Sequence, residues 1–171
     1  MKSDLKTEPC SEKPIAIRPA TKADAGVILG LIRELAEYEK LSHEVVATEE
    51  LLIRNLFGPR PYAECIIAEA NGEPIGLALF FHNFSTFLGK PGLYLEDVFV
   101  KLAWRGHGVG MQLLRELARI ALDRDCGRME WWVLDWNEPA LDFYRRLGAQ
   151  SMSDWTVQRL TRSEIEALAK D

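Results

Sequence analysis

The fold is decided by residues 93–122, LYLEDVFVKLAWRGHGVGMQLLRELARIAL. Residues 93–100 are hydrophobic enough on both faces to form a central strand of a sheet. Beyond them the leucines recur at helical spacing, which predicts a helix over 111–123. The segment WRGHGVG, residues 104–110, therefore joins a strand to a helix.

Three glycines alternate in this joining segment directly after Arg105: Gly106, Gly108 and Gly110. A glycine-rich turn at a helix N-terminus presents bare backbone N–H groups and the positive end of the helix dipole to an anion. The alternative is a tight turn whose glycines serve only to adopt positive φ angles. The alternation beside Arg105 favours an anion site, and a pyrophosphate fits that arrangement.

The sequence before residue 93 predicts a helical and strand-forming half of the same domain. Asn71-Gly72 lies between two apolar runs and is a strong hairpin signal. Thr21 and Asp24 form a loose capping box, and Thr48 caps a second helix. The predicted elements are strands over 15–18, 62–70 and 74–82, helices over 27–41 and 49–57, and a loop over 84–92.

After residue 123 the pattern predicts a second strand that completes a βαβ unit, and further elements follow. Pro139 opens a helix that Gly148 ends, and Ser163 with Glu166 caps a final short helix. The strands are expected over 128–136 and 155–160. Because no repeat or linker divides the chain, we expect a flexible leader over residues 1–14 and one domain over 15–171.

The composition limits the class of protein. The chain has 171 residues, 47% of them hydrophobic and 27% charged, as in soluble globular proteins. A formal net charge of −5 disfavours a nonspecific nucleic-acid binder. No apolar run approaches the length of a membrane helix, so we expect no membrane partner.

The cysteines and histidines indicate neither a disulfide framework nor a metal site. The three cysteines form no CxxC pair, which is typical of a reducing cytoplasm, and the three histidines are scattered. We therefore expect cytoplasmic localisation and no metal. These residues are Cys10, Cys65, Cys126, His43, His82 and His107.

Several cofactors use glycine loops. The missing Gly-Lys-Ser/Thr excludes a P-loop. A dinucleotide fingerprint would need G-x-G-x-x-G, which this loop does not match, although Glu130 lies near the distance of a ribose-binding acid. Dinucleotide binding therefore remains the alternative cofactor type.

Residues 105–110 resemble the R-x-x-G-x-G/A loop of the GNAT N-acetyltransferases. The likeness continues in DWNEPALDFYRRLGA (135–149) and IRPATKADAG (17–26). Through LIRELAEYEKL (31–41) and LYLEDVFV it is similar to the spermidine/spermine and thialysine acetyltransferases. The resemblance implies an α/β (α+β) single domain, whose mixed, mostly antiparallel sheet is splayed at the cofactor site and flanked by helices.

The resemblance also implies acetyl-CoA as co-substrate. The backbone of the glycine loop would hold its pyrophosphate, the strand before the loop would pair with the pantetheine arm, and a later stretch would line the other side. The implied cofactor-binding residues are Val98, Phe99, Val100, Arg105, Gly106, His107, Gly108, Val109, Gly110, Met111, Asn137, Glu138, Pro139 and Ala140.

Acetyl transfer to an amine needs a base, because a primary amine is protonated at neutral pH. Glu96 and Asp97 are adjacent in a strand, so their side chains point to opposite faces unless a bulge intervenes. The family pattern favours Glu96 as the base, and a structural carboxylate is the other interpretation of the pair. Tyr144 lies where the family has a tyrosine proposed to protonate the leaving thiolate. No Cys or Ser has an obvious base partner, which predicts direct attack in a ternary complex.

For the substrate, the resemblance implies a small polyamine or diamine-like amine. Tyr38, Glu39, Glu96, Asp97 and Asp154 are the expected contacts, although EYEK (37–40) is also compatible with a solvated helix end. The alternatives are an amino acid, a thialysine-like or another small amine, or a catalytically silent acyl-CoA-binding module. A homodimer is expected from the family.

Overall fold

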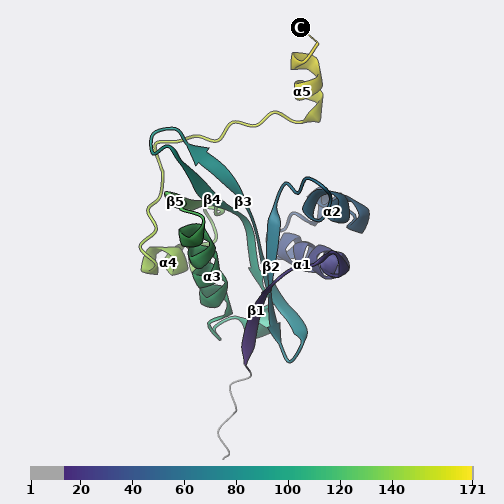
Figure 1. Cartoon of the computed structure of the whole chain (residues 1–171), viewed down its shortest axis with the longest axis vertical. Helices are drawn as coiled ribbons and strands as arrows, with labels where there is room; N and C mark the ends of the chain where they lie inside the picture. Colours follow the sequence, from purple (N-terminus) through teal and green to yellow (C-terminus); the bar gives the residue numbers. More distant parts are fainter. Residues whose placement is uncertain (1–13, 171) are drawn as a thin grey trace, which may run out of the picture. The chain divides into compact units, whose positions relative to one another are not determined.

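The computed structural model describes residues 14–170 (Figure 1). Almost all of the expected leader, residues 1–14, lies outside the described residues. By internal packing the chain divides into two compact units, Met1–Trp132 and Val133–Asp171, and each is described by itself.

The first unit is built on a five-stranded mixed sheet in the order β1-β2-β3-β4-β5. The first four strands are antiparallel to their neighbours, and β5 runs parallel to β4 after the crossover through α3. This confirms the mixed, mostly antiparallel sheet and the βαβ unit. The strands are β1 (Ile15–Pro19), β2 (Glu64–Ala70), β3 (Glu73–Ser85), β4 (Lys90–Val100) and β5 (Arg128–Trp131).

Helices cover both faces of this sheet: α1 and α2 lie on one face and α3 on the other (Figure 1). Their bounds are α1 (Ala25–Tyr38), α2 (Glu49–Leu56) and α3 (Val109–Asp123). The Oγ of Thr48 accepts a hydrogen bond from the Leu51 N–H at 3.3 Å, which confirms the predicted cap of α2.

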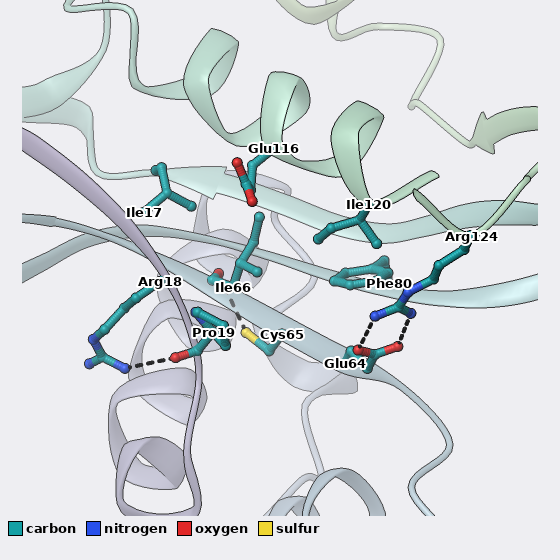
Figure 2. A pocket seen from close by; sticks show the side chains of 10 residues that line it. All are labelled: Ile17, Arg18, Pro19, Glu64, Cys65, Ile66, Phe80, Glu116, Ile120 and Arg124. Atoms are coloured by element: carbon teal, nitrogen blue, oxygen red, sulfur yellow. Dashed lines mark hydrogen bonds and ion pairs between the residues drawn. The ribbon is translucent and has the colours of Figure 1, made fainter. Parts of the chain in front are cut away.

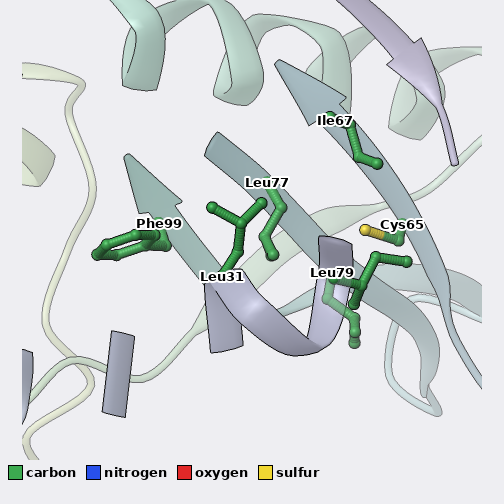
Figure 3. Packing of buried hydrophobic residues seen from close by; sticks show 7 residues of the cluster. Leu31, Cys65, Ile67, Leu77, Leu79 and Phe99 are labelled. Carbon is green, nitrogen blue, oxygen red and sulfur yellow. The ribbon is translucent and has the colours of Figure 1, made fainter. Parts of the chain in front are cut away.

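The core beneath α1 joins that helix to the inner strands (Figure 3). Leu31 of α1 packs with the sheet side chains of Leu77, Leu79 and Phe99, all nearly inaccessible to solvent. Burial of apolar side chains is the main stabilising contribution in such a domain. This cluster fixes the position of α1 over the C-terminal half of β4.

Two hairpins lie in the sheet. The β2–β3 turn places Asn71 and Gly72 at φ 54° and 78°, as expected for an Asn-Gly turn. The predicted loop over 84–92 is wrong at both ends, since β3 continues to Ser85 and β4 begins at Lys90. Pro91 pairs with Phe84 near the start of β4, a position where a strand tolerates proline.

The second unit contains two helices, α4 (Glu138–Arg146) and α5 (Arg162–Leu168). Gly148 follows α4 at φ 84°, which confirms the predicted stop. The predicted strand over 155–160 is wrong, because this segment is irregular and exposed. The final helix is capped by Thr161 and Glu164, not by Ser163 and Glu166, since the Thr161 N–H donates to the Glu164 carboxylate at 2.9 Å.

None of the helices within residues 14–170 is both long enough and apolar enough to cross a membrane.

Candidate active site

A β-bulge in β4 includes the two adjacent carboxylates, so their side chains need not point to opposite faces of the sheet. Leu95 pairs with Phe80 and Asp97 pairs with Leu79, which leaves Glu96 without a partner residue on β3. Such an extra residue resets the alternation of side chains along the strand. Asp97 therefore shares the α1-covered face with its partner Leu79, whereas Glu96 is exposed to solvent.

Asp97 is the carboxylate with the most perturbed surroundings. Its burial, and then the nearby carboxylates of Glu96 and Glu39, raise its pKa to about 6. Burial alone raises the pKa of Glu39, the residue that follows α1. The two groups come from distant parts of the sequence, and the packing of α1 over the C-terminal half of β4 brings them near enough for one carboxylate to influence the other. The nearby carboxylates of Glu96 and Glu39 make the surroundings of Asp97 negative, which attracts a cationic group.

The sheet is splayed on the β5 side of β4. The parallel pairing joins Gly92–Leu95 of β4 to Arg128–Trp131 and extends no further along β4 in the described chain. Val98, Phe99 and Val100 thus pair with β3 on one side, and no strand of the described residues pairs with them on the other. A free strand edge of this kind offers N–H and C=O groups to an extended ligand.

The glycine loop has the geometry of an anion site. Gly106 and Gly108 adopt φ angles of 80° and 77°, and a Cβ added at either would meet open space. Gly108 is the N-cap of α3, and no side chain caps that helix. The N–H groups at the start of this helix follow a turn over residues 105–108. Open donors at the positive end of a 15-residue helix fit a pyrophosphate.

Arg105 and His107 of this loop both make contacts within the protein. The Nε of Arg105 donates to the Val100 carbonyl at 3.1 Å, and its Cζ lies 4.1 Å from the centroid of the Tyr38 ring. The His107 Nδ1 lies 3.0 Å from the Arg105 carbonyl oxygen, and the His107 ring is exposed. The glycine loop therefore contacts the last residue of α1.

The remaining expected site residues belong to the second unit. Asn137 precedes α4, and the N–H groups of Ala140 and Leu141 both donate to its carbonyl at 3.0 Å. Tyr144 is half-buried within α4, with its ring 5.5 Å from that of Phe143. Asp154 lies in an exposed turn. Glu138, Pro139 and Ala140 form the first turn of α4.

Two cavities lie elsewhere in the first unit. One, of about 270 Å³, is lined by Arg33, Glu37, Ser42 and Val45. The other, of about 210 Å³, lies between α3 and the β1–β3 strands, where Arg124 pairs with Glu64 (Figure 2). Neither includes Asp97 or the glycine loop. No cluster of His, Cys, Asp or Glu within residues 14–170 is arranged to hold a metal ion.

The sequence did not indicate two features of these residues. The proximity of Glu39 to Asp97 follows from the packing of α1 on the sheet, which no local pattern reveals. The Arg105 guanidinium stacks on the ring of Tyr38, a residue 67 positions earlier in the chain. The family resemblance implies that Arg105 binds the cofactor, whereas in the structure its side chain contacts the Val100 carbonyl and the Tyr38 ring.

Comparison with known proteins identifies what this arrangement resembles. The acetyltransferase (GNAT) family profile matches residues 30–149. A thialysine N-epsilon-acetyltransferase of Bos taurus is 43% identical over 162 residues, which covers 90% of this chain and 95% of that protein. An L-ornithine N5-acetyltransferase of Arabidopsis thaliana is 32% identical, covering 90% and 87%. An integron cassette protein of V. cholerae superposes with a TM-score of 0.77 at 26% identity, covering 92% and 98%.

Proposed function

Because the chain belongs to the acetyltransferase (GNAT) family, we propose that it moves the acetyl group of acetyl-CoA to the side-chain amine of a small amino acid such as thialysine or ornithine. The observation that carries this proposal is the half-buried carboxylate Asp97, whose pKa is raised by burial and by the carboxylates of Glu96 and Glu39, on the strand that precedes an uncapped glycine loop. The chemistry of the two relatives supports the substrate class. A polyamine, the substrate that the sequence resemblance favours, is the competing choice.

The glycine loop and β4 are suited to hold acetyl-CoA. The N–H groups of 106–111 would bind the pyrophosphate, and the free edge at Val98–Val100 would hold the pantetheine arm. When bound, acetyl-CoA supplies the thioester carbon that the amine nitrogen attacks. The nitrogen–carbon bond forms as the carbon–sulfur bond breaks, and CoA leaves.

Asp97 and Glu96 are the candidate bases for the amine. A primary amine has a pKa of about 10.4, so it must lose a proton before it attacks. A carboxylate whose pKa is raised accepts a proton more readily than an ordinary one, and this favours Asp97. The carboxylate of Glu39 would attract the ammonium group into the same region.

The proton that the leaving CoA sulfur needs would come from the Tyr144 hydroxyl. Tyrosine has a pKa of about 10 and a thiol about 8.5, so a complete transfer is uphill and a hydrogen bond suffices to stabilise the thiolate. This role rests on the likeness of 135–149 to the family pattern.

Direct transfer, without an acetyl-enzyme intermediate, is supported by the burial of the Cys65 thiol. This thiol is buried in the core, and its burial raises its pKa to about 12. A thiolate is the nucleophilic form of cysteine, so Cys65 is not poised to attack a thioester.

The experiment is a comparison of amines at fixed acetyl-CoA, with free-thiol release as the readout. Thialysine, L-ornithine, L-lysine, spermidine and an aminoglycoside would be compared by kcat/KM. We expect the kcat/KM for thialysine or ornithine to exceed that for spermidine by at least about 10-fold. A substrate whose polar groups all find hydrogen-bond partners in the site is favoured by factors of this size. A preference for spermidine would overturn the substrate class and leave the acetyltransferase intact.

We also propose that the protein acts as a homodimer. Apolar side chains in the second unit are more than half exposed, and burial in a second copy would remove them from water. These side chains are Met152, Trp155, Val157, Leu160 and Leu168.

A further inference from the structure

The last turn of α1 has an unfavourable cap. The Leu41 N–H donates to the Ala36 carbonyl at 2.8 Å and the Lys40 N–H to the Glu37 carbonyl at 3.1 Å, which is the Schellman pattern of a helix C-terminus. That pattern requires a left-handed residue, usually glycine, and here it is Lys40 at φ 63°. A left-handed lysine is disfavoured, so this turn opens more readily than a glycine-capped one.

A contact from the glycine loop holds the same turn. The Arg105 guanidinium lies over the Tyr38 ring and 5.8 Å from the ring centroid of Phe99, a core residue. Its Nε is fixed by the Val100 carbonyl. Tyr38 itself packs against the core beneath α1. The Arg105 side chain therefore connects the start of the glycine loop to the end of β4 and the end of α1.

Glu39 follows Tyr38 directly, and its carboxylate is near enough to Asp97 to contribute to the raised pKa of that residue. The position of its carboxylate depends on whether the last turn of α1 is closed. We propose, on the basis of the proposed function, that Arg105 is a positioning residue. When CoA orders the glycine loop, the stacking of Arg105 on Tyr38 also orders the last turn of α1. That turn places Glu39 for binding of the amine.

The consequence is a positive coupling between the two ligands. CoA bound to the glycine loop would restrict the motion of the Arg105 side chain, and Arg105 would in turn hold the Tyr38 ring. The Glu39 carboxylate would then already be in position when the amine binds. Such coupling is reciprocal for equilibrium binding. An exposed cation–aromatic contact contributes enough to change an opening equilibrium by about 5-fold.

The test is hydrogen exchange at single residues, with CoA as the only ligand. In the wild-type protein, CoA should slow exchange at the glycine loop and, by about 5-fold, at the amides of Glu39 and Leu41. Tyr38→Phe keeps a ring and should retain the distant effect. Tyr38→Leu and Arg105→Lys should lose it, while the loop of Tyr38→Leu still responds. Tyr62→Leu and Arg119→Lys, at exposed positions, are matched controls and should behave as wild type.

A rescue variant separates positioning from folding. Lys40→Gly removes the strained left-handed lysine, so the turn should stay closed without the stack. The double variant Tyr38→Leu/Lys40→Gly should therefore exchange slowly at Leu41 with or without CoA. In kinetics, Tyr38→Leu should raise KM for thialysine about 5-fold and Tyr38→Phe should not.

The outcomes distinguish this proposal from the proposed function. Slowing at the loop without slowing at Glu39 and Leu41, or equal slowing there in Tyr38→Leu, would overturn the role of Arg105 and leave the cofactor site standing. No slowing anywhere on addition of CoA would contradict the cofactor site itself.

Discussion

At the scale of single residues, Asp97 lies on the sheet face that α1 covers, and its pKa is raised to about 6 by burial and by Glu96 and Glu39. Its folded pKa lies above the ordinary carboxyl value near 3.9, so the ionised form destabilises the fold at neutral pH. Stability should therefore increase as the pH falls from about 6 toward 4 on account of this group. A carboxylate kept at such a site serves a role other than stability.

We predict that Asp97→Asn lowers kcat at least about 100-fold, because a positioned base contributes factors of that size. The same variant should have a higher Tm than wild type at pH 7, and the difference should shrink between pH 6 and 4. Kinetics and thermal unfolding across this range measure both effects. Glu96→Gln is the matched control, and a larger loss of kcat in Glu96→Gln than in Asp97→Asn would transfer the base to Glu96.

Tyr144 gives a second prediction at this scale. Tyr144→Phe should lower kcat at least about 10-fold with little change in CoA affinity, since only the hydroxyl is removed. Steady-state kinetics and calorimetric titration with CoA separate the two quantities. Tyr62→Phe serves as control, because Tyr62 is exposed. Turnover near the wild-type rate in Tyr144→Phe would remove this residue from the mechanism.

At the scale of elements, the glycine loop leads directly into the start of α3, and the two form one continuous turn and helix N-terminus. Gly106 and Gly108 need left-handed backbone, and Gly110 is helical within α3. The positive φ angles expected of a tight turn are present at Gly106 and Gly108, and the anion site at the uncapped helix end stays a prediction. The loop and helix followed from local spacing alone, because turn and helix signals are local.

The element-scale prediction compares two glycines with equal backbone strain. Gly108→Ala and Gly72→Ala both place a Cβ at a φ of 77° or 78° with open space around it. Each should lose about 1 kcal/mol of unfolding free energy. Only Gly108→Ala should also weaken CoA binding, by about 10-fold, which calorimetry measures. Equal CoA affinity in the two variants would mean that the loop does not bind the pyrophosphate.

Other elements could not be predicted because they depend on distant partners. The bulge at Glu96 is defined by its register against Leu79 and Phe80, which the sequence of β4 does not contain. The expected strand over 155–160 has the right residue types, but strand formation needs pairing with another strand, and no strand of the described chain pairs with this segment. The position of Glu39 beside Asp97 is likewise a product of tertiary packing.

At the scale of the whole molecule, the exposed apolar side chains of the second unit predict self-association. We expect a dimer in solution, with the mass measured by light scattering on a size-exclusion column. Replacing both Trp155 and Leu168 by Ser should shift the protein toward monomer, because each is more than two-thirds exposed in the single chain and would be buried by the second copy. Replacing Phe87, which is 96% exposed in the β3–β4 turn of the first unit, is the control. A monomer at all concentrations for the wild type would contradict the dimer.

The central claim, acetylation of a side-chain amine, is tested most directly by identifying the product. Thialysine is incubated with acetyl-CoA and the wild-type protein or Asp97→Asn, and the acetylated nitrogen is located by NMR. With the wild-type protein we expect the acetyl group on the side-chain nitrogen and one CoA thiol released per acetyl group. With Asp97→Asn we expect very little product. Acetyl on the α-nitrogen, or no acetylated amine while CoA binds normally, would contradict it.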